Sequence, residues 1–175
     1  VAARVKVLSY AMLNLGVDVQ ENVGVFSQNS LEYILTDMAA WGIRAVTVPF
    51  YATSSEEQIH FMIEDAQIRY VFVGEQEQYD KTISIMPLSS TLEKIIVFDR
   101  RVNIDSRLAI YFDDFLRMGE EKPMQSDLTA LLKQASDDDI SNILYTSGTT
   151  GDSKGVILTH GQNRAAMIAN DEALE

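Results

Sequence analysis

The segment VGVFSQNSLEYILTDMAAWGIRAVTV, residues 23–48, contains the alternation on which the fold prediction depends. Its two ends, Val23–Phe26 and Ala45–Val48, are short apolar runs rich in β-branched residues, which is typical of buried strands. Ser30 is suited to cap a helix between them. Apolar residues on one face of that helix recur at helical spacing, namely Leu31, Ile34, Leu35, Met38 and Ala39. The segment therefore predicts a strand, a helix and a second strand.

The same alternation continues on both sides of this segment. Further apolar runs occur at Tyr70–Val73 and Ile95–Phe98, so the four runs follow one another at intervals of about 22 to 25 residues. A helix is expected over Val5–Leu15, ended by a left-handed Gly16, and another after a capping box of Ser54 and Glu57. Strands that are apolar on both faces belong to parallel sheets. We therefore predict an α/β fold with a mainly parallel sheet and helices on both faces.

The pattern is looser after Phe98. Shorter helices are expected over residues 113–118 and 127–135, and a strand over Asn142–Thr146. The acidic run Asp137–Asp139 just before that strand is interpreted as a solvated turn. In the core we expect Trp41 and Met38, which stand at helical spacing, whereas His60 is expected to be a partly exposed helical residue.

Composition limits the classes of partner. The chain has 175 residues, a net charge of −12 and no cysteine, so disulfides and thiolate-bound zinc are excluded and nucleic acid is not an expected partner. Its apolar runs are too short to cross a bilayer, so we predict no transmembrane segment, while peripheral membrane contact stays open. A cytoplasmic location is expected. The sequence predicts no metal ligands and leaves the oligomeric state open.

The segment YTSGTTGDSKG, residues 145–155, differs from the rest of the chain in composition. It combines hydroxyl side chains with three glycines and one lysine, and it lies between two strand-like runs. Glycine lets backbone amides approach a ligand closely, hydroxyls add donors, and Lys154 supplies a mobile positive charge suited to phosphate oxygens. The segment therefore predicts a phosphate-binding loop.

Two other interpretations fit the loop less well. A polar hairpin tip would explain glycine and threonine but gives no role to Lys154 or to the density of hydroxyls. A Walker loop places a glycine before its lysine and opens a helix. Here Ser153 precedes Lys154, Gly155 follows it, and the next residues read as a strand.

Residues 145–155, continued by Val156, Leu158, Thr159 and His160, resemble the signature loop of the adenylate-forming superfamily. That loop is usually written Y/F-TSGTTG-x-PKGV-x-x-TH, and the superfamily contains acyl-CoA synthetases, firefly luciferase and the adenylation domains of peptide synthetases. Ser153 stands where the family commonly has proline, which should loosen the backbone. Upstream, Gln20–Asn29 and Val48–Gly74 are also similar, the latter to fatty-acyl-CoA synthetases.

The resemblance implies ATP-dependent activation of a carboxylic acid, first to an acyl-adenylate and then to acyl-CoA. A long-chain fatty acid is the expected substrate, with ATP, Mg²⁺ and coenzyme A. The implied phosphate-binding residues are Thr146, Ser147, Gly148, Thr149, Thr150, Gly151 and Lys154, of which Lys154 also stabilises charge during the reaction. Tyr145 is expected to pack at the strand end, and His160 to begin the last helix after a Thr159 cap.

The resemblance also implies a domain assignment. Residues 1–175 correspond to the N-terminal part of the family's large AMP-binding domain, truncated, with the C-terminal domain outside the chain. We therefore expect the chain alone to be inactive. Two alternatives stay open, namely a non-catalytic nucleotide-binding or interaction module and an amino-acid-activating adenylation domain.

Overall fold

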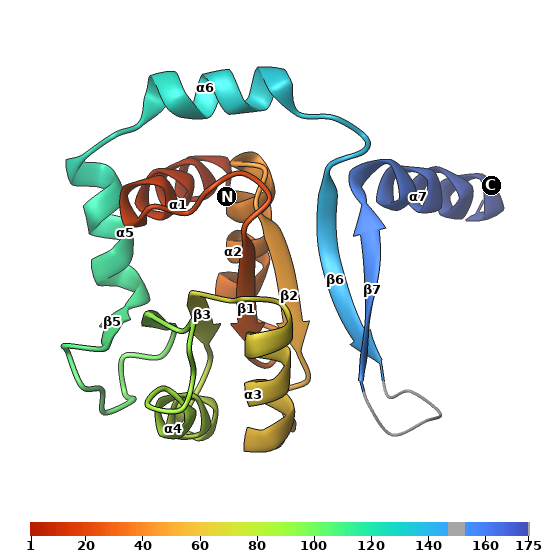
Figure 1. Cartoon of the computed structure of the whole chain (residues 1–175). Helices are drawn as coiled ribbons and strands as arrows, with labels where there is room; N and C mark the ends of the chain where they lie inside the picture. The colour runs from red at the N-terminus through yellow and green to blue at the C-terminus, as the bar shows by residue number, and fades with distance from the viewer. Residues whose placement is uncertain (147–152, 175) are drawn as a thin grey trace.

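The computed structural model describes residues 1–146 and 153–174, with side chains to Asp171. A seven-stranded sheet in the order β5-β4-β3-β1-β2-β6-β7 runs through it, with helices on both faces (Figure 1). Neighbouring strands are parallel except β6 and β7. The strands are β1 (Asn22–Phe26), β2 (Val46–Phe50), β3 (Tyr70–Val73), β4 (Lys94–Val97), β5 (Ala109–Tyr111), β6 (Ile140–Thr146) and β7 (Lys154–Thr159). The helices are α1 (Ala2–Leu15), α2 (Leu31–Gly42), α3 (Glu56–Asp65), α4 (Gln76–Ile85), α5 (Phe112–Glu121), α6 (Gln125–Gln134) and α7 (His160–Leu174). The predicted α/β class is confirmed.

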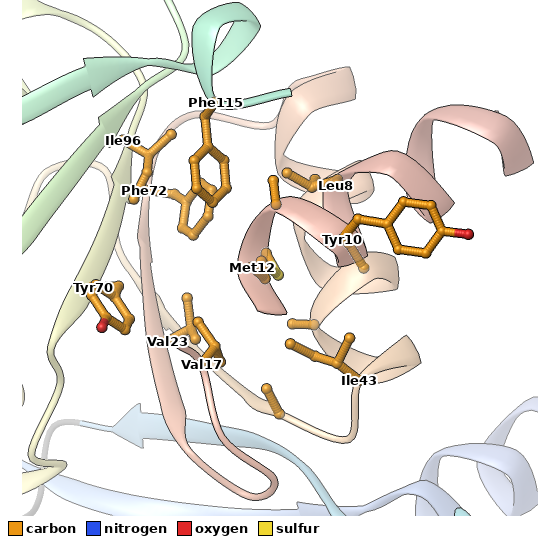
Figure 2. Packing of buried hydrophobic residues seen from close by; sticks show 14 of the residues in the cluster. Leu8, Tyr10, Met12, Val17, Val23, Ile43, Tyr70, Phe72, Ile96 and Phe115 are labelled. Carbon is orange, nitrogen blue, oxygen red and sulfur yellow. The ribbon is translucent and has the colours of Figure 1, made fainter. Parts of the chain in front are cut away.

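Two buried clusters lie on opposite faces of the sheet. One, the α2-side core, joins α1, α2, α5 and α6 to the sheet (Figure 2). The other, the α3-side core, joins α3 and α4 to the opposite face. The residues of β3 alternate between them, since Tyr70 and Phe72 belong to the first and Val71 and Val73 to the second. Both faces of the central strands are therefore covered, as their continuous apolar runs predicted.

Local signals placed several helix ends correctly. Gly16 ends α1 in the left-handed conformation with φ 90°. Ser30 caps α2, because its side chain accepts a hydrogen bond from the backbone N–H of Tyr33 at 3.1 Å. Thr159 and Gln162 exchange hydrogen bonds across the first turn of α7, which begins at His160 as predicted.

The predicted capping box of α3 was wrong by one residue. Ser55 is the cap, its partner is Gln58, and each accepts a hydrogen bond from the other's backbone N–H. Ser54 is buried instead, and its carbonyl accepts a hydrogen bond from Lys81 Nζ at 3.0 Å. Glu57 lies in the first turn, where its charge favours the helix N-terminus.

The buried face of α2 also differs from the prediction. Leu35 and Ala39 are buried, but Leu31, Ile34 and Met38 are 50%, 54% and 43% exposed. The helix carries two adjacent apolar stripes, and the one that faces the sheet continues through Ala40 to Ile43. Met38 is therefore not a core residue, while Trp41 is partly buried and donates its indole N–H to the carbonyl of Ser141 at 3.0 Å.

The acidic run before β6 is only partly a solvated turn. Asp137 and Asp138 are exposed, whereas Asp139 is buried and accepts two hydrogen bonds from Arg44, from Nε at 2.8 Å and from Nη2 at 2.9 Å. The paired guanidinium lowers the pKa of Asp139. This ion pair joins the end of α2 to the start of β6 and so helps to position the strand that leads into the predicted loop.

Helices α1 and α5 approach each other closely at Gly119. A Cβ atom on Gly119 would lie 2.2 Å from the carbonyl oxygen of Val7 and 2.9 Å from the backbone nitrogen of Ala11. Glycine is therefore required by contact between the two backbones. In the part of the chain that the structure describes, no helix combines the length and apolar character needed to span a bilayer.

Candidate functional site

The β6–β7 hairpin holds the two ends of the predicted phosphate loop. Thr146, the last residue of β6, pairs in antiparallel register with Lys154, the first residue of β7, and both are exposed. Of the predicted phosphate-binding residues, these two are described, whereas Ser147, Gly148, Thr149, Thr150 and Gly151 lie outside the described residues. A strand follows Lys154, so the helix that a Walker loop would open does not occur here.

Tyr145 lies at the base of this hairpin and is buried, as expected for a residue packed at the strand end. Its hydroxyl donates a hydrogen bond to a carboxylate oxygen of Asp65 on α3. Its ring stands edge-on to Phe61, with 6.2 Å between ring centroids. Burial, followed by the contact with Asp65, raises the pKa of the Tyr145 hydroxyl. The side chain therefore stays a neutral donor at physiological pH.

The order of the strands places a crevice beside the hairpin. β1 and β2 are parallel neighbours, but α2 after β1 packs in the α2-side core and α3 after β2 packs in the α3-side core. In open α/β sheets, ligands bind outside the carboxyl ends of strands at such a reversal. The arrowheads of β1, β2 and β6 point toward one end of the molecule, where α2 and α3 also begin (Figure 1). The positive ends of both helix dipoles thus face this edge.

A cavity of about 360 Å³ occupies that edge. Ser27, Gln28 and Asn29 line it from the end of β1, and residues 50–52 line it from the end of β2. Leu144, Tyr145 and Thr146 of β6 complete the wall, together with Tyr33 of α2. A second cavity of about 390 Å³ reaches the same hairpin from the α3 side, between Tyr51, Gln58, Tyr145, Thr146 and Ser153. Both open spaces therefore reach Thr146.

Sequence reasoning missed the residues that follow β1 and β2. Ser27–Asn29 and Tyr51 carry polar groups directly after two strands that the sequence predicts. The position of such residues was a usable signal, because carboxyl ends of parallel strands share one edge. The strand order that brings β6 beside β2, however, depends on a pairing between residues almost a hundred positions apart, for which no local pattern exists.

Asp37 lies one helical turn after Tyr33, away from the crevice. Burial raises the pKa of Asp37 to about 6, an effect that a hydrogen bond from Thr47 partly offsets. Its Oδ1 is buried and finds no hydrogen-bond partner among the described residues. Burial and then the charge of Asp37 raise the pKa of Tyr33 to about 12. The charged form of this carboxylate is thus disfavoured by its burial.

Other titratable side chains contribute little to the site. His60 is partly exposed on α3, as predicted, and His160 begins α7 with its ring edge-on to Trp41 at 5.8 Å between centroids. Within residues 1–146 and 153–171, no three His, Asp or Glu side chains gather in a way that could hold a metal ion. Around the hairpin, Thr146 supplies a hydroxyl group and Lys154 a positive charge.

A family model described as AMP-binding enzyme matches residues 1–174. The chain is similar to fatty acyl-CoA synthetase A of Dictyostelium discoideum, with 32% identity over 158 residues that cover 86% of this chain and 22% of that protein. It is also similar to a long-chain-fatty-acid–CoA ligase of Rattus norvegicus, 32% identical over 152 residues, which cover 86% of this chain and 22% of that ligase.

Among solved structures, the chain is similar to an anthranilate CoA ligase in complex with anthranoyl-AMP. The TM-score is 0.77 and the identity 25%, over 90% of this chain and 28% of that one. The chain thus spans about a quarter of the length of the proteins that it matches.

Proposed function

The chain belongs to the AMP-binding enzyme family, and from that membership we propose that the whole protein activates a carboxylic acid with ATP and transfers it to coenzyme A. In the first half-reaction the carboxylate attacks the α-phosphate of ATP, forming an acyl-adenylate and releasing pyrophosphate. In the second, the thiol of coenzyme A attacks the acyl carbon and AMP leaves. The observation that carries the proposal is the strand–loop–strand arrangement, in which β6 ends at Thr146 and β7 begins at Lys154.

We propose a long-chain fatty acid as the acyl substrate. The support is that fatty acyl-CoA synthetases and long-chain-fatty-acid–CoA ligases are about 30% identical to this chain over most of its length. The similar anthranilate CoA ligase makes an aromatic acid the competing substrate. Pyrophosphate exchange with a panel of fatty, aromatic and amino acids separates these classes, and a preference for amino acids would instead indicate an amino-acid-activating domain.

We assign the β- and γ-phosphates of ATP to the hairpin and its loop. The proposed ligands are the backbone amides and hydroxyls of residues 146–151 together with the ammonium group of Lys154. Their task is to position pyrophosphate as leaving group and to stabilise the charge that it gains. A hydrogen bond to a charged group contributes roughly 1.5 to 3 kcal/mol. Three or four such bonds can therefore hold a triphosphate against the repulsion from a chain whose net charge is −12.

We further propose that residues 1–175 form the N-terminal part of the large AMP-binding domain and do not catalyse the reaction alone. Mg²⁺ would neutralise part of the triphosphate charge, and we assign it no ligand among the described residues. Acyl-adenylate formation by the isolated chain would contradict this assignment. A cytoplasmic location remains a prediction from the sequence.

Substitution of Lys154 in the whole protein tests the proposed function. Lys154→Ala should slow ATP–pyrophosphate exchange by about 10² to 10³-fold, the cost of removing one preorganised donor. Lys133→Ala removes the same charge from an exposed position on α6 and serves as control. Unchanged exchange in Lys154→Ala would refute the role of Lys154. Binding of ATP without exchange by the unmodified protein would favour a non-catalytic nucleotide-binding module.

A further inference from the structure

Tyr145 contacts both strands of the hairpin. It belongs to β6, and in the antiparallel register it stands opposite Gly155 of β7. A Cβ atom on Gly155 would lie 3.4 Å from Cζ of Tyr145 and 2.8 Å from Cγ2 of Ile143. The tyrosine ring therefore lies against the backbone of the partner strand, one pair before Thr146 and Lys154. Movement of this ring would move both ends of the loop.

Helix α3 fixes the outer end of the same ring. The Tyr145 hydroxyl donates to the Asp65 carboxylate, and Phe61, one turn earlier on α3, stands edge-on to the ring at an interplanar angle of 86°. The helix itself is anchored in the α3-side core by Ile59 and Ile63, both fully buried. The hairpin has a firm support on this side, since a charged acceptor makes a strong hydrogen bond to a phenol.

The Asp65 contact is long-range and specific. It joins residues 80 positions apart and connects α3 to β6. Of the two strands that flank α3 in sequence, β6 pairs with β2 and not with β3. The register between β2 and β6 is given by one pair, Thr47 and Asn142, near the start of β6. Toward the other end of β6, where the loop begins, Asp65 supplies a second point of attachment.

We propose that Asp65 is a positioning residue: by holding the Tyr145 hydroxyl, it fixes the base of the β6–β7 hairpin so that Thr146 and Lys154 are aligned for the triphosphate end of ATP. This inference rests on the proposed function, because it assumes that the hairpin handles phosphate. Asp65 itself does not touch the nucleotide. Loss of Asp65 should therefore raise KM for ATP and leave KM for the acid unchanged.

The test uses the whole protein with Tyr145→Phe, Asp65→Ala, the double variant and Asp65→Asn. Tyr145→Phe and Asp65→Ala should each raise KM for ATP in pyrophosphate exchange by about tenfold, the fold-change expected for one lost hydrogen bond to a charged group. KM for the acid should not change. The double variant should be no worse than either single variant, because both remove the same bond. Asp65→Asn keeps an acceptor oxygen and should restore most of the affinity.

Tyr70→Phe is the matched control. Tyr70 is also buried, and its hydroxyl donates to the carbonyl of Leu15 at 3.1 Å, at the opposite end of the sheet. It should lower stability without changing KM for ATP. An equal rise of KM in Tyr70→Phe, a multiplicative effect in the double variant, or wild-type KM in both single variants would overturn the inference.

Hydrogen exchange separates failure of this inference from failure of the proposed function. In Asp65→Ala, the backbone amides of residues 140–146 and 154–159 should exchange faster than in the unmodified protein, whether or not the protein has activity. If the unmodified protein shows no pyrophosphate exchange, the proposed function fails, and the amides still decide whether Asp65 holds the hairpin. Unchanged protection of both strands would overturn the positioning role.

Discussion

The half-buried carboxylate of Asp37 gives a prediction with a defined sign. Its pKa rises from the ordinary 3.8 to about 6 in the folded chain. Between these values the folded state holds a proton that the unfolded state has released. The stability contributed by the protonated form is therefore complete below about pH 4, falls as the pH rises toward 6, and is absent above it. Asp37→Asn should remove this loss because an amide cannot ionise.

The size of the effect follows from the same interval. From 3.8 to about 6 is about two pH units, and each unit corresponds to about 1.36 kcal/mol, so the upper limit is roughly 3 kcal/mol. Asp37 is only partly buried, and solvent reduces the penalty. The amide also adds an N–H₂ group beside a buried position that offers few partners. We expect Asp37→Asn to gain about 1 to 2 kcal/mol at pH 7.5.

Urea unfolding of residues 1–175 at pH 4.5, 6 and 7.5 measures the difference between Asp37→Asn and the unmodified chain. The difference in free energy of unfolding should grow with pH over this range. Asp138→Asn removes one charge from an exposed position and controls for the change in net charge. A stabilisation that is equal at all three pH values would refute the reasoning, since it would owe nothing to ionisation of Asp37.

Two further substitutions test the packing by the same measurement. Gly119→Ala should destabilise the chain by about 1 to 3 kcal/mol, because the added methyl group would press on the α1 backbone at Val7, where a Cβ would lie 2.2 Å from the carbonyl oxygen. Unchanged stability in Gly119→Ala would contradict this. Ser30→Ala should cost about 1 kcal/mol through loss of the α2 cap, and a neutral result would show that the bond to the Tyr33 N–H contributes nothing measurable.

Features set by neighbouring residues were predictable from the sequence. Gly16 ends α1 and Ser30 caps α2 because a left-handed glycine and a hydroxyl acceptor act within one turn. The strand that enters the loop at Thr146 was also predicted from its apolar residues, whereas β7 begins at Lys154, which the sequence had placed within the loop. Ser54 was mistaken for Ser55 because adjacent serines offer equivalent caps, and the backbone path after β2 decides between them.

Features set by distant residues were not predictable. Periodicity placed the apolar residues of α2 on one face and could not show that Met38 faces outward, because that depends on what the helix packs against. In the sequence, Asp139 is one of three equivalent acidic residues. What distinguishes it is the hydrogen bond from Arg44, which lies 95 positions away. The crevice beside Tyr145 likewise depends on the strand order, which brings segments together that share no local signal.

The antiparallel pairing of β6 with β7 has a consequence for the order in which the chain folds. Thr146 and Lys154 are only eight positions apart in the sequence, and β-hairpins form in about 1 to 10 μs. Thr47 and Asn142, which join β6 to the rest of the sheet, are 95 positions apart. Their contact should form more slowly, because closing so long a loop costs more chain entropy. During that interval the hairpin exposes an unpaired edge of β6, so association between nascent chains competes with docking onto β2.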